Sequence, residues 1–269
     1  DIVSTRRDEV AAYLEPLMED SDKDVRKFAL DILYQLKTVE AAPYMICFLN
    51  DPDINIVITA VEYLGSLDAR EYAGSINQVL KNANNLLLRC TCLEALAKIG
   101  NEESKQIVYE LFPDPEAIKG LELFSYLKFL AKQGDAGTLP FVLTLMKNNG
   151  RLLAKEIINT LEGILERGAD GNLAEEMLSE ILNFIAGDIN SINKYELLVF
   201  LGQFHNPAIL GPLLEYARSE DKLVALGAIE GLGLLGRKEA TLVLRELMAS
   251  ANDEDIMDAL EKSLQQVNG

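Results

Sequence analysis

Leucines recur along this chain at nearly constant intervals, each within an apolar pattern of helical spacing. The series is Leu33, Leu64, Leu96, Leu127, Leu161, Leu201, Leu232 and Leu264, and the intervals are 31, 32, 31, 34, 40, 31 and 32 residues. Repetition at this period is typical of an α-solenoid, in which each repeat is a pair of helices that buries its apolar face against its neighbours. The chain is therefore predicted to be all-α, with about eight helix pairs.

The stretch from Leu86 to Gly100 shows this pattern most clearly. Its stripe at helical spacing consists of Leu88, Cys92, Ala95, Leu96 and Ile99. Asn84 and Asn85 precede the stretch as candidate N-caps, and Gly100 follows it as a helix stop. We expect the stripe to face neighbouring helices, and Cys90, Glu94 and Ala97 to face outward.

The repeats divide the whole chain into one predicted array. Their boundaries are 8–37, 40–67, 70–100, 102–134, 137–168, 172–204, 207–236 and 239–268. Polar turns such as 20–24, 51–53 and 148–150 precede the second helix of most pairs, and apolar first helices, for example 41–49, precede the turns. The sequence begins at Asp1 without Met, which leaves open a processed product or a domain of a longer protein.

The charge balance narrows the classes of partner. The chain carries 25 basic and 43 acidic residues, a net charge of −18, and the acidic surplus is present in both halves. Such a field repels phosphate, which disfavours direct binding to nucleic acids or anionic membranes. It suits a basic protein partner, and it equally serves solubility.

The three cysteines fit neither a disulfide framework nor a zinc site. They are Cys47, Cys90 and Cys92, and Cys92 stands where related positions have alanine, so it is predicted to be a small core residue. No apolar run reaches the length of about 18 residues that a membrane helix needs. These features favour a reducing, cytoplasmic location without membrane insertion.

Residues with catalytic chemistry are sparse. His205 is the only histidine, which excludes paired-histidine metal sites, and its place at a helix end suggests a favourable dipole interaction. Acidic pairs at 102–103, 175–176 and 253–255 suit helix starts, and the glycine-rich run 227–236 suits close helix packing. Tyr34, Tyr63, Tyr126 and Tyr195 differ in helical phase, so no stacking platform is predicted. We therefore expect no catalytic, cofactor or metal residues, and no enzyme.

Two segments carry a resemblance to a known family. The run from Leu17 to Leu33, with its Val25-Arg26 pair, and the run from Leu88 to Ala97 are similar to HEAT-like repeats of the type named after phycobilisome lyases. A third match is Ala228 to Gly233. The resemblance implies a right-handed α–α superhelix whose second helices line the concave side. It says little about function, because such repeats are mostly scaffolds and adaptors, with a few enzymes.

The candidate binding surface follows from the positions opposite the core stripe on the second helices. One row carries the carboxylates of Asp31, Glu62, Glu94 and Glu230, and another is intermittently apolar, with Ile58, Cys90, Leu121, Tyr195 and Leu226. A concave face of this kind would bind a basic or amphipathic segment of a partner. A phase error of one residue would instead turn the apolar positions toward the core.

Three functions remain open from the sequence. The leading hypothesis is a non-enzymatic scaffold or adaptor for protein partners, with an oligomeric state that the sequence does not define. The second is a subunit of a bilin-lyase-like enzyme, or its chaperone-like partner, which rests on the family resemblance alone. The third is a helical-repeat nucleic-acid binder, which the acidic row argues against.

Overall fold

The computed structural model describes residues 13–114, 117–168, 175–204 and 206–268. Within these ranges the regular structure is entirely helical, as predicted. The chain forms two compact units, residues 1–134 and 135–269, and the division coincides with the predicted boundary between the fourth and fifth repeats. The two units are described separately below as unit 1 and unit 2.

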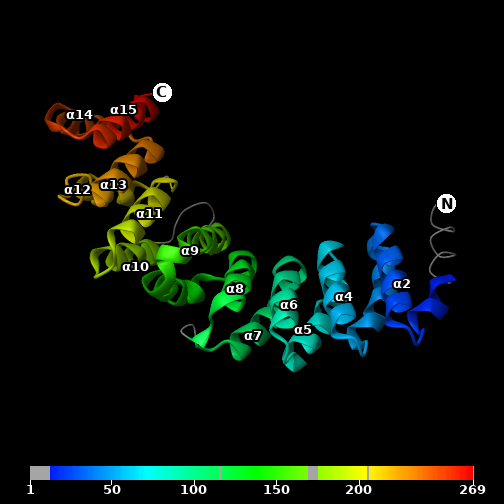
Figure 1. Ribbon diagram of the computed structural model, residues 1–269. Coiled ribbons are helices and arrows are strands. Elements are labelled where there is room, and N and C mark those ends of the chain that lie inside the picture. The colour runs from blue at the N-terminus through cyan, green and yellow to red at the C-terminus, as the bar shows by residue number, and fades with distance from the viewer. Residues whose placement is uncertain (1–12, 115–116, 169–174, 205, 269) are drawn as a thin grey trace. The chain divides into compact units, whose positions relative to one another are not determined.

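Unit 1 is an α-solenoid of helix pairs in two layers. Its second helices lie side by side, with α4 packed on α6 and α6 packed on α8, while α5 and α7 form the other layer (Figure 1). The second helices are α2 Lys23–Gln35, α4 Ile54–Ser66, α6 Leu86–Ile99 and α8 Gly120–Gln133. The first helices are residues 13–18, η1 Val39–Ala41, α3 Ala42–Met45, η2 Ile46–Asn50, η3 Arg70–Tyr72, α5 Ala73–Asn82 and α7 Glu102–Leu111.

Unit 2 has the same construction. Its second helices α11, α13 and α15 pack in sequence, and α12 and α14 cover them (Figure 1). The elements are η5 Ala136–Thr138, α9 Leu139–Gly168, α10 Glu175–Ala186, α11 Ser191–Gly202, η6 Pro207–Ile209, α12 Leu210–Tyr216, α13 Lys222–Leu235, η7 Lys238–Ala240, α14 Thr241–Ser250 and α15 Glu254–Asn268.

The recurring leucines form the core of each unit, as predicted. The seven from Leu33 to Leu232 are at most 1% exposed. Leu264, the last of the series, is only partly buried. It lies on α15, which packs against α13 and α14, and no later repeat follows it among the described residues.

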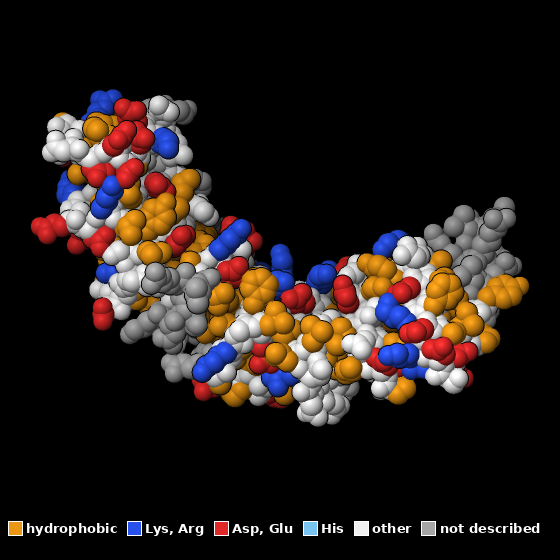
Figure 2. Space-filling model, in the orientation of Figure 1, with side chains coloured by type: hydrophobic (Ala, Val, Ile, Leu, Met, Phe, Trp, Pro, Cys, Tyr) orange, Lys and Arg blue, Asp and Glu red, His pale blue; other side chains and the backbone are white. Residues whose placement is uncertain are grey.

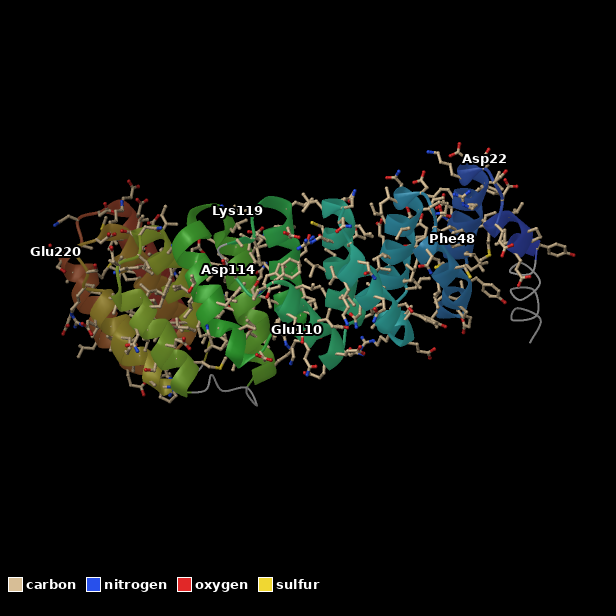
Figure 3. All side chains as sticks on the ribbon, turned by 90° about the horizontal axis from the view of Figure 1, so that it is seen from below. Asp22, Phe48, Glu110, Asp114, Lys119 and Glu220 are labelled. Carbon is tan, nitrogen blue, oxygen red and sulfur yellow. The ribbon has the colours of Figure 1, made fainter. Side chains whose placement is uncertain are left out.

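Several of the predicted polar turns cap second helices. The Asp22 side chain, labelled in Figure 3, accepts the backbone N–H of Asp24 at 2.9 Å, and Asn85 accepts that of Leu88 at 3.0 Å. Such bonds satisfy backbone donors that the first turn of a helix leaves unpaired. Asn85 is thus the N-cap of α6 among the two candidates that the sequence offered.

Polar contacts also join the starts of consecutive second helices. Lys23, the first residue of α2, lies 3.2 Å from Asp53, the N-cap of α4. In unit 2, Ser191 at the start of α11 donates to Asp221, the N-cap of α13. Lys222 at the start of α13 donates to Asp253 at 2.8 Å. The contact therefore recurs at three junctions between consecutive second helices, one in unit 1 and two in unit 2.

The arginine of the Val-Arg pair also links two repeats. Arg26 is only 8% exposed, and its guanidinium makes two bonds to the carboxylate of Asp51, at 2.7 and 2.9 Å. Its remaining nitrogen donates to the backbone carbonyls of Asp20 and Ser21. The guanidinium holds the pKa of the Asp51 carboxyl below its usual range. A charge that is paired and bonded in this way can be tolerated within the fold.

Glycines allow close approach in unit 2. A Cβ atom on Gly231 would lie 2.5 Å from the carbonyl oxygen of Leu198, and one on Gly227 would lie 2.7 Å from the Cα of Tyr195. No side chain fits at these distances, so α11 and α13 meet backbone to backbone. This confirms close packing as the purpose of the glycine-rich run. Gly236 ends α13 in a left-handed conformation, with φ of 64°.

Two local predictions need correction. The first helix expected over 41–49 is helical throughout but irregular, since the 3-10 segments η1 and η2 flank the short α-helix α3. The turn expected at 148–150 is helical. The change of direction occurs at Leu153, where φ is −123° and ψ is 19° inside α9. The turn propensity of the Asn-Gly pair is overridden there.

Candidate functional site

The predicted binding residues lie on second helices of both units. Unit 1 contains Asp31 on α2, Ile58 and Glu62 on α4, Glu94 on α6 and Leu121 on α8. Unit 2 contains Tyr195 on α11, and Leu226 and Glu230 on α13. All eight side chains are at least partly exposed, and Leu121 is 50% exposed. On the side seen in Figure 2, acidic and apolar side chains lie next to one another over each unit, with basic side chains scattered between them.

In unit 1 the structure brings three of these residues to one groove. The groove has a volume of about 300 Å3, and we call it the α6 groove. It is lined by Glu62, Ser66, Leu87, Cys90, Thr91, Glu94, Ala95, Lys98 and Leu121. Asp31 and Ile58 are not among its lining residues. The groove combines apolar side chains with carboxylates, as the predicted face requires.

The two carboxylates of the α6 groove differ in their surroundings. Glu94 accepts a hydrogen bond from Ser125 at 3.1 Å and pairs with Lys128 at 2.9 Å, both on α8. Glu62 is exposed, and its carboxylate makes no hydrogen bond or ion pair within the described part of the chain. Glu62 is therefore the carboxylate of this groove that is free to meet a ligand.

Cys90 and Ala97, expected to face outward, are buried in unit 1. They are 3% and 7% exposed, because α6 is flanked by α4 on one side and by α8 on the other. The expectation for Glu94 holds, since its side chain is partly exposed. Cys92 is fully buried, as predicted, and burial raises the pKa of its thiol to about 12. Of the predicted apolar row, Cys90 alone is buried, at the floor of the α6 groove.

A tyrosine pair that the sequence did not predict lies beside Asp31. The rings of Tyr34 on α2 and Tyr63 on α4 stack at 3.8 Å between centroids, with an interplanar angle of 9°. The Tyr63 hydroxyl donates to Asp31 at 2.7 Å, and Lys27 pairs with the same carboxylate. The two tyrosines occupy different phases on their helices. The contact depends on how α2 and α4 are offset along their axes, so the helical phase of each tyrosine does not predict it.

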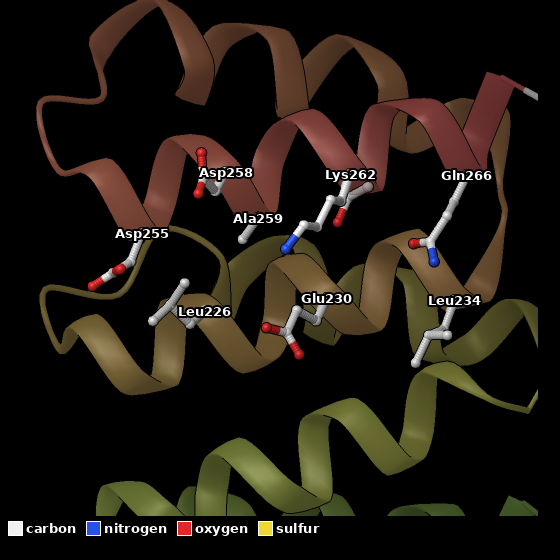
Figure 4. A pocket seen from close by; sticks show the side chains of 9 residues that line it. Leu226, Glu230, Leu234, Asp255, Asp258, Ala259, Lys262 and Gln266 are labelled. Atoms are coloured by element: carbon white, nitrogen blue, oxygen red, sulfur yellow. The ribbon is translucent and has the colours of Figure 1, made fainter.

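In unit 2 a larger pocket lies between α13 and α15. Its volume is about 550 Å3, and we call it the α13 pocket (Figure 4). Leu226, Glu230 and Leu234 line it from α13. Asp255, Asp258, Ala259, Lys262, Ser263 and Gln266 line it from α15. Two predicted residues, Leu226 and Glu230, thus share this pocket, and the α15 residues were not predicted.

The third predicted residue of unit 2 bonds to Glu230. The Tyr195 hydroxyl donates to Glu230 at 2.7 Å, from α11 to α13. Burial and this bond raise the pKa of Tyr195 to about 12, so the phenol remains a donor at neutral pH. Burial also raises the pKa of the neighbouring Glu196, and the negative charge of Glu230 adds to this shift. The cluster concentrates negative charge on the second-helix layer.

The other chemical candidates add no site in the described ranges. No group of three or more histidine, cysteine or acidic residues could hold a metal ion there. His205 and the side chains of residues 175–176 lie outside what the structure describes. Asp253 accepts from the backbone N–H groups of Asp255 and Ile256, which confirms that this acidic group caps a helix. None of the described helices is both long and apolar enough to cross a membrane.

Comparison with known proteins relates the chain to helical repeats. Residues 178–265 match the family model of HEAT repeats, whereas no curated protein matches the sequence. Among solved structures, an engineered protein is 16% identical with a TM-score of 0.51, over 95% of this chain and 78% of its own. YibA of E. coli is 16% identical with a TM-score of 0.50, over 97% and 96%.

A further similar structure is the complex of CpcE and CpcF of phycocyanin lyase from Nostoc sp. PCC7120. It is 14% identical with a TM-score of 0.49, over 97% of this chain and 94% of that one. At such low identities the likeness of YibA and of the engineered protein concerns the fold alone.

Proposed function

The chain carries HEAT repeats over residues 178–265, and from this premise we propose that it is a non-enzymatic scaffold or adaptor for protein partners. The partly apolar, acidic face of its second helices binds a basic or amphipathic segment of the partner. The binding residues on this proposal are Asp31, Ile58, Glu62, Glu94, Leu121, Tyr195, Leu226 and Glu230. We further propose that the protein acts in the cytoplasm.

The observation that carries the proposal is the pair of open depressions on the second helices, one in each unit. Both combine leucine side chains with carboxylates: Leu87 and Leu121 with Glu62 in the α6 groove, and Leu226 and Leu234 with Glu230 in the α13 pocket. Exposed apolar side chains inside a depression favour a ligand that covers them. Carboxylates around them favour a cationic ligand over an anionic one.

The charge of the chain supports a protein partner over a nucleic acid. A net charge of −18 repels a polyphosphate backbone, and the lining of both depressions includes carboxylates. Nothing in the described residues favours the bilin-lyase alternative.

A direct test is to offer the full chain a panel of short synthetic peptides. The panel contains basic amphipathic, basic polar, acidic amphipathic and neutral sequences, and binding is measured by fluorescence anisotropy. We expect the basic amphipathic peptides to bind most tightly, and their affinity to fall with rising salt, because exposed charge pairs are screened. A panel without this preference would contradict the proposal.

The surface is tested by a triple variant, Glu62→Lys with Glu94→Lys and Leu121→Asp. The matched control makes the same changes on the first-helix layer, Glu71→Lys with Glu103→Lys and Leu111→Asp, at three positions that are also exposed. Circular dichroism establishes that both variants fold. We expect the first variant alone to lose affinity for the basic amphipathic peptides. Equal losses in the two variants would point to net charge rather than to a site.

A further inference from the structure

We propose that the α6 groove receives an extended peptide segment with one basic and one apolar side chain, with about four residues between them. The basic side chain pairs with Glu62, and the apolar one packs between Leu87 and Leu121. This inference rests on the proposed function and specifies its ligand. It also assigns recognition of the basic residue to unit 1 rather than to the α13 pocket.

One end of the α6 groove is apolar. Leu87 on α6 is 50% exposed, and so is Leu121 on α8. Both side chains line the groove, so a single apolar side chain can cover both. Removing this apolar surface from water favours binding.

The acidic end of the groove is on α4. Glu62 is exposed and makes no hydrogen bond or ion pair within the described residues, whereas Glu94 is already paired with Lys128. A basic side chain that reaches Glu62 therefore gains a carboxylate without displacing an existing partner. Because Glu62 is exposed, its desolvation cost on pairing is small.

Lys98 adds a positive charge to the groove. It lies on α6, is exposed, and is without an ion pair in the described part of the chain. Its positive charge opposes a second basic residue in the segment. The groove thus selects one basic side chain at a defined position over a polybasic run. A surface that attracts any cation would not make this distinction.

The floor of the groove is lined by small side chains. It is formed by α6, where Cys90, Thr91 and Ala95 are small, and the Thr91 hydroxyl is bonded to the carbonyl of Leu87 at 2.9 Å. α4 approaches here closely enough that a Cβ on Gly65 would lie 2.8 Å from the Cα of Ala95. Small side chains between two walls suit a segment that crosses α6.

The separation of the two side chains follows from helix packing. Axes of packed helices lie about 8–10 Å apart, so the path from α4 over α6 to α8 covers about 16–20 Å. An extended chain advances about 3.3 Å per residue. The basic and apolar residues are therefore five or six positions apart, with about four or five residues between them.

The α13 pocket is less suited to this ligand. Glu230 accepts the hydroxyl of Tyr195, and Asp255 pairs with Lys222 at 2.6 Å. Lys262 also lines this pocket, directly among the carboxylates (Figure 4). Two of its acidic groups are engaged within the protein, so a cationic side chain has less to gain there.

The test uses the full chain with methyl-labelled leucines and capped peptides that contain one Arg and one Leu in a Gly/Ser background. Peptides with one, four or eight residues between Arg and Leu are titrated, and methyl NMR shifts report both the site and the Kd. We expect the peptide with four intervening residues to bind most tightly and to shift the methyl groups of Leu87 and Leu121. The methyl groups of Leu226 and Leu234 should stay in place.

Two single-residue variants carry opposite expectations for the same peptide. Glu62→Gln should raise the Kd about two- to fivefold, the range for an exposed ion pair, and Lys98→Gln should lower it. Both positions are exposed, and thermal unfolding checks that the fold is retained. Glu71→Gln, at an exposed position of the first-helix layer, is the control and should leave the Kd unchanged.

The outcomes separate this inference from the proposed function. Equal effects of Glu62→Gln and Lys98→Gln, no dependence on spacing, or shifts at Leu226 in place of Leu87 would overturn the inference. Tight binding of other basic amphipathic peptides would then still support the scaffold. If neither this series nor the wider panel binds, the proposed function itself fails.

Discussion

Tyr195 and Glu230 join two neighbouring repeats through one short hydrogen bond, with 2.7 Å between the phenolic oxygen and the carboxylate. Tyr195 lies on α11 and Glu230 on α13, in positions that the sequence placed in separate rows of the candidate surface. The bond fixes the carboxylate at the edge of the α13 pocket. It therefore contributes both to stability and to the charge that a ligand would meet.

Removing this hydroxyl tests its contribution to stability. We expect Tyr195→Phe to lower the free energy of unfolding by about 1.5–3 kcal/mol, the usual net value of a hydrogen bond to a charged group. Urea unfolding followed by circular dichroism measures the change. Tyr63→Phe is the comparison: Asp31 keeps Lys27 as a partner there, so the loss should be smaller. An equal or larger loss at Tyr63 would contradict this account.

Glu196 should make the stability depend on pH. Its pKa is raised in the folded protein by burial and by the charge of Glu230. A raised pKa means that the folded state favours the protonated form, so stability falls as pH rises through the folded pKa. Glu196→Gln should therefore stabilise the protein at about pH 7, by on the order of 0.5 kcal/mol because the site is partly exposed.

The same advantage should vanish below the ordinary pKa of glutamate, at about pH 4. There the wild-type side chain is neutral in both the folded and the unfolded protein. Chemical unfolding of both proteins at stepped pH values measures the difference. A stabilisation by Glu196→Gln that is constant over the whole range would show that packing, not titration, is responsible.

Close packing of α11 on α13 predicts a sharp difference between two glycine substitutions. Gly231→Ala places a Cβ 2.5 Å from the carbonyl oxygen of Leu198, so the two helices must separate. We expect a loss of about 1–3 kcal/mol, as for other overpacked sites. Gly74→Ala, at an exposed position of α5 with no atom within 4 Å of the added Cβ, should instead stabilise by about 0.5–1 kcal/mol. Thermal unfolding measures both changes in stability. If the two variants shifted stability in the same direction, the prediction would be refuted.

Two buried asparagines offer a further contrast. Asn77 on α5 is fully buried, and neither atom of its side-chain amide has a hydrogen-bond partner among the described residues. Asn193 on α11 is equally buried, but its amide nitrogen donates to the carbonyl of Met146 at 2.9 Å. We expect Asn77→Leu to raise the free energy of unfolding by about 1 kcal/mol, since an unpaired buried amide is costly.

Asn193→Leu should lower the free energy of unfolding by about 1–3 kcal/mol, because the Met146 carbonyl loses its donor inside unit 2. Urea unfolding of the two single variants provides the measurement. If Asn77→Leu proved as destabilising as Asn193→Leu, the Asn77 amide would have to be satisfied in solution.

The recurring leucines made the fold predictable, because burial of one residue per repeat leaves a strong periodic signal. Seven of those eight leucines are at most 1% exposed. Details that depend on neighbouring helices were not predictable in the same way. Cys90 and Ala97 lie on the outer side of α6 when that helix is considered alone, yet α4 and α8 cover them. The stack of Tyr34 on Tyr63 likewise depends on the offset between α2 and α4.

The candidate surface was predictable in outline only. Helical phase placed Glu62, Glu94 and Leu121 on exposed second-helix positions, and they line one groove. The phase of a single helix contains no information about which partner a neighbouring helix offers. Leu87, Lys98 and the α15 residues of the α13 pocket were missed for that reason, and so was the bond that engages Glu230.

The contacts between the first residue of one second helix and the N-cap of the next have a consequence for folding. Asp53, Asp221 and Asp253 each satisfy backbone donors of their own helix and also hold the preceding repeat, through Lys23, Ser191 and Lys222. Nucleation is the unfavourable step of helix formation. A cap that is already held in place by a folded neighbour lowers that cost. Order should therefore spread across these three junctions from one repeat to the next, and fraying should stop where such a contact is intact.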